Sequence, residues 1–457
     1  MNRIWLLLAV VLFSMQLNAA SGRFVTISDL HFNPFFDPTL VADLKAKPAS
    51  EWSAIFASTT KKGFGDYGGS EETNDALFAS VLADAARRLP DADFVLFTGD
   101  IIAHGFQKRY GMAAPTPEYE AFVLKSVNYV LRRITETFPN KPVYFTLGNN
   151  DSYCGDYKVA PEGRFLGDTA KLITGTLLHD PANGPAVAVS YAKGGYYSVA
   201  LPQGQGRMVA VNTILFSRHY EEACGPRVDY DPAKAQFQWL EMVLKTAKSK
   251  GEPVWLLLHV PPGVDVFATL KRAKGGRIES VASMWQPLHL SRFLDLVRQY
   301  QTTIRAAFAG HTHMDNFRLI SSKHEGAPAA AYVHTSPAVS AQFGNNPAYS
   351  LYSYDVNTFA PANFEVYYLN IADRGEGGWR FEYDFVQRYG VPSINVANLD
   401  RIRASLPTDA ERRAWWERLY NVSHTATPAI DGTNFKGYWC GMSELTEAAF
   451  TDCYNTQ

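Results

Sequence analysis

The sequence lacks any marked excess of charge of one sign. Across its 457 residues, 43 Lys and Arg are balanced by 45 Asp and Glu, which gives a formal net charge of −2, and no long basic run occurs. Nucleic-acid binding needs a concentrated positive surface, so there is no footprint for a nucleic-acid partner. An anionic ligand would have to be held by local charge, such as a metal ion. With 46% apolar residues, the chain can bury a sizeable core.

Long hydrophobic runs are also scarce, and the one clear example lies at the start of the chain. Arg3 precedes the apolar run Ile4–Phe13, and small residues at positions 19–21 follow it. This layout is typical of a secretory signal peptide with cleavage near Ala20, and the run is too short to cross a bilayer comfortably. An uncleaved anchor is the alternative. We expect residues 1–20 to be a signal peptide, the protein to be secreted or periplasmic, and no later segment to be transmembrane.

Cysteine is rare, with only Cys154, Cys224, Cys440 and Cys453 in the chain. An even number in an exported chain favours disulfide bonds over metal ligation by thiolates. Because Cys440 and Cys453 lie close together in the sequence, we expect them to pair, which leaves Cys154 for Cys224. Buried free thiols are the alternative.

Apolar runs and helical stripes alternate through much of the chain, and this alternation predicts a layered α/β fold. The expected strands are 23–28, 94–97, 143–147, 253–258 and 304–309, and the expected helices are 74–89, 118–138, 288–300 and one that begins at Pro232 after an N-cap at Asp231. Two further strand-like runs between Tyr196 and Asn212, separated by residues 202–206, suggest a hairpin.

The remaining segments divide the chain into two parts. An irregular stretch starts at Pro34, residues 63–69 form a glycine-rich loop, and strands are expected between residues 332 and 370. Short helices follow, with 409–420 the clearest. We therefore expect one large domain over residues 21–390 and a small helical subdomain over residues 391–457. Asn421-Val422-Ser423 fits a glycosylation acceptor.

The predicted strands end in side chains that can bind metal ions. These residues are Asp29, His31, Asp100, Asn149, His259, His311 and His313. Asp and His two positions apart on an extended strand point to the same side, so Asp29 and His31 can reach one ion. A single histidine is most often structural, but a group of oxygen and nitrogen ligands without cysteine suits Zn²⁺, Mn²⁺ or Fe.

As a set, these strand ends resemble the signature of the calcineurin-like metallophosphoesterases. The matching elements, in order across residues 23–315, are Asp29-x-His31, Gly99-Asp100, Gly148-Asn149-x-Asp151, His259 and Gly310-His311-x-His313. The resemblance implies a four-layer sandwich, in which helices flank two central β-sheets, and assigns residues 21–390 to the metallophosphoesterase domain.

The same resemblance implies a site for two divalent metal ions, with Zn²⁺ the first choice and Mn²⁺ or Fe the alternatives. It assigns one ion to Asp29, His31, Asp100 and His313, and the other to Asp100, Asn149, His259 and His311, so that Asp100 bridges them. Such a pair of ions supplies a bridging hydroxide for in-line attack on phosphorus.

Within this superfamily, the chain is most similar to acid sphingomyelinase-like phosphodiesterases. The likeness rests on the export signal, on His104 four residues after Asp100, on the run Asn345–Tyr349 and on the cysteine-bearing helical tail. Relatives usually carry a cysteine near residues 65–69, where this chain has none. We expect His104 to be the acid that protonates the leaving alkoxide of a diester. The alternative is that His104 only packs against, or orients, a metal ligand.

Two positions depart from the patterns of relatives. Asn150 stands where the superfamily usually has histidine, and its neutral amide can hydrogen-bond a phosphoryl oxygen but cannot donate a proton at useful rates. Ala103 stands where purple acid phosphatases have a metal-binding tyrosine. Asn149-Asn150-Asp151 also resembles the corresponding motif of endopolyphosphatases, so the expected substrate is a small phosphodiester, a nucleotide or a polyphosphate. The resemblance implies an exported di-metal phosphodiesterase first, with endopolyphosphatase or nucleotide pyrophosphate hydrolase activity as the alternative. A protein that retains its metals but lacks turnover is a third candidate.

Overall fold

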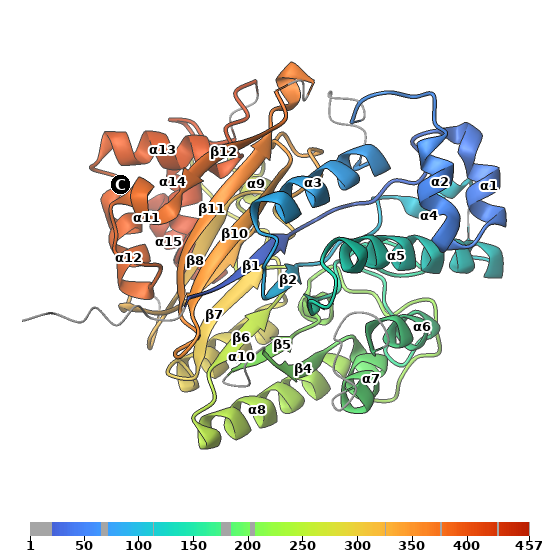
Figure 1. Ribbon diagram of the computed structural model, residues 1–457. Coiled ribbons are helices and arrows are strands. Elements are labelled where there is room, and N and C mark those ends of the chain that lie inside the picture. The colour runs from blue at the N-terminus through green and yellow to red at the C-terminus, as the bar shows by residue number, and fades with distance from the viewer. Residues whose placement is uncertain are drawn as a thin grey trace, which may run out of the picture.

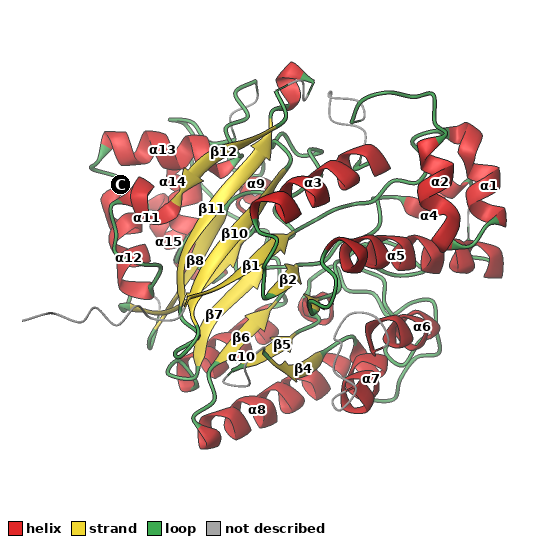
Figure 2. Ribbon diagram, in the orientation of Figure 1, coloured by secondary structure: helices red, strands yellow, loops and turns green. Residues whose placement is uncertain are grey.

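The computed structural model describes residues 21–64, 72–112, 114–174, 184–201, 206–324, 326–374, 377–426 and 429–456. Two six-stranded sheets pack against each other, and helices cover their outer sides (Figures 1 and 2). The predicted four-layer α/β fold is therefore confirmed. The predicted signal peptide at 1–20, residues 65–69 of the glycine-rich loop and the hairpin turn at 202–205 lie outside the described residues.

The first sheet has the strand order β12-β11-β10-β1-β2-β3. Its parallel strands are β1 (Ser21–Ile27), β2 (Phe94–Phe97) and β3 (Val143–Phe145), and its antiparallel extension is β10 (Ala348–Asp355), β11 (Pro361–Leu369) and β12 (Trp379–Asp384). Ile27 pairs with Phe97, and Phe97 pairs with Phe145. The three parallel strands therefore end level with one another, and their following loops share one edge of the sheet.

The second sheet has the order β4-β5-β6-β7-β9-β8. The strands are β4 (Tyr197–Ala200), β5 (Arg207–Ala210), β6 (Val254–Leu257), β7 (Ile304–Ala309), β8 (Asn316–Ser321) and β9 (Ala329–Thr335). β4 and β5 form the predicted antiparallel hairpin. β5, β6 and β7 are parallel, with Leu257 opposite both Ala210 and Phe308, so these strands also end at one level.

Aromatic side chains fill the space between the two sheets. The ring of Phe24 on β1 lies 5.3 Å from that of Trp255 on β6 and 5.7 Å from that of Phe308 on β7. The indole nitrogen of Trp255 donates to the carbonyl oxygen of Phe359 at 2.6 Å, so this buried polar group is satisfied. The apolar runs that predicted the strands thus become the common core.

The helices predicted between the strands are α3 (Asp75–Arg88), α5 (Pro117–Thr137), α8 (Pro232–Lys250) and α10 (Pro287–Gln299). Asn74 and Asp231 cap α3 and α8 by accepting from backbone N–H groups of the first turn. Among the described residues, no helix combines the length and the apolar character needed to cross a membrane.

Several short helices were not predicted. They are α1 (Val41–Ala46), α2 (Trp52–Ala57), α4 (Phe106–Tyr110), α6 (Arg164–Leu172), α7 (Gly184–Gly194) and α9 (Val266–Leu270). The stretch after Pro34 is therefore less irregular than expected. Helices as short as α1 and α2 bury only a few side chains, such as Leu44 and Trp52, and so show no sustained stripe.

The C-terminal region is helical, as expected, and packs beside the sheets (Figure 1). Its helices are α11 (Phe385–Tyr389), α12 (Val396–Ser405), α13 (Ala410–Tyr420), α14 (Phe435–Gly441) and α15 (Glu447–Asn455). A disulfide bond between Cys440 and Cys453 joins α14 to α15, and Cys154 is bonded to Cys224. Both predicted disulfides are present.

Asn421, which begins the triplet that fits a glycosylation acceptor, is engaged inside the fold. Asn421 is buried, and its amide nitrogen donates to the carbonyl oxygens of Gly344 at 3.0 Å and His424 at 3.2 Å. Attachment of a glycan requires an exposed amide, whereas this one holds the loop that contains Gly344 against the end of α13. A sequence triplet alone does not show whether its asparagine is buried.

Candidate metal centre and active site

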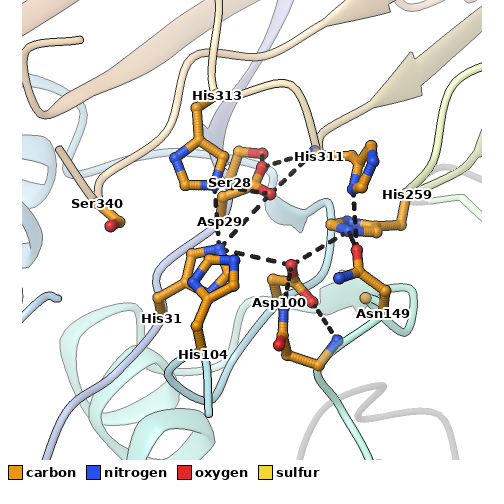
Figure 3. A network of polar contacts seen from close by, with 12 residues as sticks. Ser28, Asp29, His31, Asp100, His104, Asn149, His259, His311, His313 and Ser340 are labelled. Atoms are coloured by element: carbon orange, nitrogen blue, oxygen red, sulfur yellow. Dashed lines mark hydrogen bonds and ion pairs between the residues drawn. The ribbon is translucent and has the colours of Figure 1, made fainter. Parts of the chain in front are cut away.

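The seven predicted metal ligands come together where the parallel strands of both sheets end (Figure 3). β1 is followed by Asp29 and His31, β2 by Asp100, β3 by Asn149, β6 by His259, and β7 by His311 and His313. All of them except the half-buried His311 are almost completely buried. Burying so many polar side chains is costly unless they are paired with one another or with a ligand.

Asp100 lies at the centre of this group. Its Oδ2 atom is 3.4 Å from His31 Nε2 and 3.3 Å from His259 Nε2, and these two histidines follow strands of different sheets. Its Oδ1 atom accepts the backbone N–H of Asn150 at 2.8 Å. A single carboxylate therefore faces two groups of nitrogen ligands, which is the arrangement expected of a bridging ligand.

The first group consists of Asp29, His31 and His313. The Nε2 atoms of the two histidines are 3.0 Å apart, and Asp29 Oδ1 lies 4.0 Å from His31 Nε2 and 3.7 Å from His313 Nε2. Asp29 is held in place by the backbone N–H of His311, which donates to it at 2.9 Å, and by the hydroxyl of Ser28. Lone pairs of two neutral rings that converge in this way suit one shared cation.

The second group consists of Asn149, His259 and His311. Asn149 Oδ1 lies 2.9 Å from His259 Nε2 and 2.8 Å from His311 Nδ1. His259 Nδ1 donates to the carbonyl oxygen of Thr98 at 2.7 Å, which fixes the ring and turns Nε2 toward Asp100. At that position Nε2 can carry a proton or bind a metal cation, and either would balance the negative charge of Asp100.

The pKa values of these groups fit a cation-binding site. Burial lowers the pKa of His31 to about 4 and that of His311 to about 3, so both rings are neutral donors at neutral pH. Burial also opposes the charge on His259 and on Asp100, but their mutual attraction prevails. It raises the pKa of His259 to about 9 and holds the pKa of Asp100 well below its usual range. Neutral rings of His31 and His311 beside the ionised carboxylate of Asp100 thus suit divalent metal ions.

The backbone of the site is strained. Asp29, His31, Asp100, His311 and His313 all have positive φ, between 45° and 71°, a region that residues other than glycine rarely adopt. Such strain persists only where the surrounding structure enforces it. The positive φ at these residues turns each side chain away from the direction of its strand and into the shared site.

Two glycines explain how the strand ends approach so closely. A Cβ atom at Gly148 would overlap the Asp100 carboxylate, and one at Gly310 would lie 2.5 Å from Asp29 Oδ2. Only glycine therefore allows these two loops to pass beside the ligands. The Gly-Asn and Gly-His pairs seen in the sequence have this steric reason.

His104 and Asn150, the two predicted catalytic residues, occupy different positions. His104 stacks on His31 with ring centroids 4.0 Å apart, retains 28% side-chain exposure and lines the cavity described below. Asn150 is buried behind Asp100, and its amide nitrogen donates to Asp100 Oδ2 at 3.0 Å. In this conformation the Asn150 side chain serves Asp100, so a hydrogen bond to a phosphoryl oxygen would require it to turn.

Several polar partners of the site were not predicted from the sequence. Glu72 accepts from His104 Nδ1 at 2.7 Å, Asp156 accepts from the amide of Asn149 at 2.8 Å, and the hydroxyl of Tyr157 lies 3.1 Å from His311 Nε2. Asp151 belongs to the predicted Gly148-Asn149-x-Asp151 motif, but no role was predicted for it. Its carboxylate accepts the backbone N–H groups of Gly148, Ile101 and Ile102 and so ties the loop after β3 to the loop after β2.

A cavity of about 700 Å³ adjoins the metal ligands. Asp100, His104, Asn149, His311 and His313 contribute to its wall. Much of the remaining wall is apolar and comes from α9, from the loop after β9 and from the C-terminal helices, including Val266, Leu270, Phe343, Tyr420, Tyr438 and Gly441. The edge that carries the predicted metal ligands and the C-terminal helices thus face a common space.

The chain matches two family models. Residues 22–315 match the model described as calcineurin-like phosphoesterase, and residues 325–457 match the acid sphingomyelin phosphodiesterase C-terminal region. The gap between the models falls at residues 316–324, whereas our predicted boundary at 390/391 follows the change from strands to helices and stays a prediction.

Relatives align with this chain over nearly its whole length. Acid sphingomyelinase-like phosphodiesterase 3b of Mus musculus is 30% identical over 453 residues, which cover 95% of this chain and 90% of the relative. The protein of the same name from Homo sapiens is 27% identical, with 95% and 90% coverage. The Mus musculus protein named cyclic GMP-AMP phosphodiesterase SMPDL3A is 26% identical, with 95% and 92% coverage. This chain therefore belongs to the calcineurin-like phosphoesterases, a family of metal-dependent hydrolases, within the group of acid sphingomyelinase-like phosphodiesterases.

Proposed function

We propose that this protein is an exported di-metal phosphodiesterase that hydrolyses small phosphoric diesters. The observation that carries the proposal is the position of Asp100 between two groups of nitrogen ligands, beside a cavity with a largely apolar wall. Asp29, His31, Asp100 and His313 would hold one ion, and Asp100, Asn149, His259 and His311 the other. Zn²⁺ suits this oxygen and nitrogen set best, with Mn²⁺ or Fe as alternatives. When bound, such ions activate water and polarise the phosphoryl oxygens.

Two further side chains support the reaction in this proposal. His104 would protonate a leaving alkoxide, and its position in the cavity wall, stacked on His31, supports this role. Asn150 donates two hydrogen bonds to Asp100, one from its backbone and one from its amide, and so would hold that carboxylate in its bridging orientation. The loss of a histidine at position 150 leaves His104 as the acid.

The cavity favours a diester over a polyphosphate. Among the described residues of its wall, Lys271 and Arg318 are the only Lys or Arg side chains. The terminal nitrogens of the buried Arg318 already donate to the carbonyl oxygens of Pro262 and Val264. A polyanion would need several available positive charges. A diester with an apolar or planar substituent could instead bury it against the wall. A nucleotide-type diester is one such candidate, because a relative is named for cyclic GMP-AMP.

The export part of the proposal rests on two independent features. The first 20 residues have the layout of a signal peptide. The Cys154–Cys224 and Cys440–Cys453 bonds belong to an oxidising compartment, since cytosolic thiols are usually kept reduced. Secretion or periplasmic delivery would satisfy both features. Sequencing of the N-terminus of the exported protein tests this, and a mature chain that begins at Met1 would contradict it.

A substrate panel tests the reaction. Purified protein loaded with Zn²⁺ or Mn²⁺ should hydrolyse bis-nitrophenyl phosphate and a nucleotide diester much faster than nitrophenyl phosphate or polyphosphate. Faster hydrolysis of polyphosphate would favour the endopolyphosphatase alternative. Two bound ions with no turnover on any member of the panel would favour the binding-protein alternative.

Metal removal is the second arm of this test. A strong chelator should abolish hydrolysis, and added Zn²⁺ or Mn²⁺ should restore it. Circular dichroism should change little on chelation, because the large aromatic core between the sheets does not depend on metal in the way a zinc finger does. Full activity in chelated protein with no detectable metal would contradict the proposal.

A further inference from the structure

Glu72 is a buried carboxylate beside the proposed acid. It precedes Asn74, the N-cap of α3, and is 1% exposed. Its Oε1 atom accepts from His104 Nδ1 at 2.7 Å and from the backbone N–H of His104 at 3.3 Å. A buried carboxylate without such partners would be costly, so Glu72 and His104 form one unit.

The other side of Glu72 is held by a loop from the C-terminal part of the chain. Ser340 Oγ donates to Glu72 Oε2 at 3.1 Å. The orientation of the Gln342 amide that satisfies its hydrogen bonds places the nitrogen 3.2 Å from the same oxygen, closer still to Glu72 Oε1, and 2.9 Å from His104 Nδ1, so Gln342 contacts both members of the pair. Glu72 therefore accepts from both His104 and the loop that follows β9, and Ser340 of that loop lies 268 positions from Glu72 in sequence.

The ring of His104 is confined on three sides. Glu72 binds Nδ1, His31 stacks on one face at 4.0 Å and 16°, and Phe343 meets the ring edge-on at 5.6 Å and 85°. An ionised carboxylate can only accept, so Nδ1 carries the proton of that hydrogen bond. The nitrogen left for a ligand in the cavity is Nε2.

We propose that Glu72 is the positioning residue of this enzyme: it fixes the ring and the tautomer of His104 so that Nε2 faces the leaving oxygen. This inference rests on the proposed function of His104. The loop Ser340–Gln342 completes the arrangement by holding Glu72 from the opposite side. Because position 150 has no histidine, the orientation of His104 alone determines delivery of the proton.

The test compares two diesters that share one substituent but differ in the leaving group, one nitrophenyl and one alkyl. Glu72→Ala should lower kcat for the alkyl ester at least about tenfold, because a misplaced acid cannot protonate a poor leaving group. The nitrophenyl ester should lose less than about threefold, since its leaving group departs without a proton. Glu72→Gln should recover part of the loss, because an amide oxygen still accepts from Nδ1.

Two controls separate positioning from folding. Asp84→Asn removes a different buried carboxylate, which accepts from Arg88 and Tyr349, and should lower thermal stability without changing the ratio of the two rates. In a His104→Ala background, Glu72→Ala should cause no further loss on the alkyl ester. If Glu72→Ala does not fold, the double variant Ser340→Ala with Gln342→Ala removes the supporting donors and should shift the ratio in the same direction.

Three outcomes would overturn the inference. Equal losses on both esters would make Glu72 merely structural. Loss of a bound metal from Glu72→Ala would make it a ligand, since Glu72, His31 and His104 lie close enough to share an ion. An unchanged ratio would show that His104 needs no positioning. If the wild-type enzyme hydrolyses neither ester, the proposed function fails instead, so the two failures are distinguishable.

Discussion

The two walls of the cavity are built in different ways. One wall, here called the catalytic edge, consists of the predicted metal ligands and their neighbours, which are mostly buried polar side chains after parallel strands. Five of these residues have positive φ. The other wall, here called the C-terminal wall, is formed by α9, the loop after β9 and the C-terminal helices. It consists of apolar and aromatic side chains, including Phe343, Tyr420 and Tyr438. The first wall provides charge and the second provides shape. Substitutions of the predicted metal ligands should therefore change metal content and kcat, and substitutions in the C-terminal wall should change KM.

The largest effect is expected from Asp100→Asn. Asp100 Oδ2 lies within 3.4 Å of nitrogens from both ligand groups, so the loss of its charge weakens both proposed ion sites at once. We expect no detectable turnover and one bound ion or fewer per chain. Metal analysis and hydrolysis of bis-nitrophenyl phosphate check this prediction.

Asp93→Asn is the matched control for this substitution. Asp93 lies at the opposite end of β2, where it accepts from the backbone N–H of Arg23 at 2.8 Å and from Tyr354 at 3.0 Å. This variant should retain two ions and near-normal turnover, with at most a modest loss of stability. Two ions and full activity in Asp100→Asn would contradict the site itself.

A selective effect is expected from His104→Ala. Loss of a general acid typically costs about 10²–10⁴-fold in rate, but only when the leaving group needs the proton. Alkyl diesters should therefore be affected far more than nitrophenyl esters, while the metal content stays unchanged. Equal rate losses on both substrates would show that His104 only packs or orients a ligand.

His289→Ala is the control for the removal of an imidazole ring. His289 is buried on α10, where its ring lies 5.8 Å from that of Phe216, and it lies outside the catalytic edge. This substitution should lower stability by leaving a cavity, but the ratio of the rates on alkyl and nitrophenyl esters should not move.

The convergence of the predicted ligands at one edge was predictable because each of them follows a short apolar strand. Asp29 and Asn149 could be found in this way. The order of their motifs along the chain indicated which other residues belong to the same set. Their strained backbone could not be predicted, since φ depends on the contacts of the folded loops. The strands could be predicted because they are uninterrupted apolar runs. The same apolar character buries them in the two sheets.

The C-terminal wall and the support of His104 were not predictable. Glu72 follows a glycine-rich stretch with no recognisable pattern, and Ser340 meets it only through folding. Tyr438 and Gly441 looked like parts of an appendage, because nothing in a short helix reveals which surface it faces. Long-range contacts of this kind leave no local period in the sequence.

The smallest effect is expected where α14 packs on α9. A Cβ atom at Gly441 would lie 2.5 Å from a methyl group of Val266, and both residues line the cavity. Gly441→Ala should therefore push α9 away and reshape the apolar wall. We expect KM for diesters with bulky substituents to rise severalfold, while kcat and metal content remain near those of the wild type; overpacking should also cost about 1–3 kcal/mol of stability. Gly432→Ala is the matched control, because its new Cβ would meet nothing within 4 Å. A change of metal content in Gly441→Ala, or equal KM changes in both variants, would break the division between a wall that provides charge and one that provides shape.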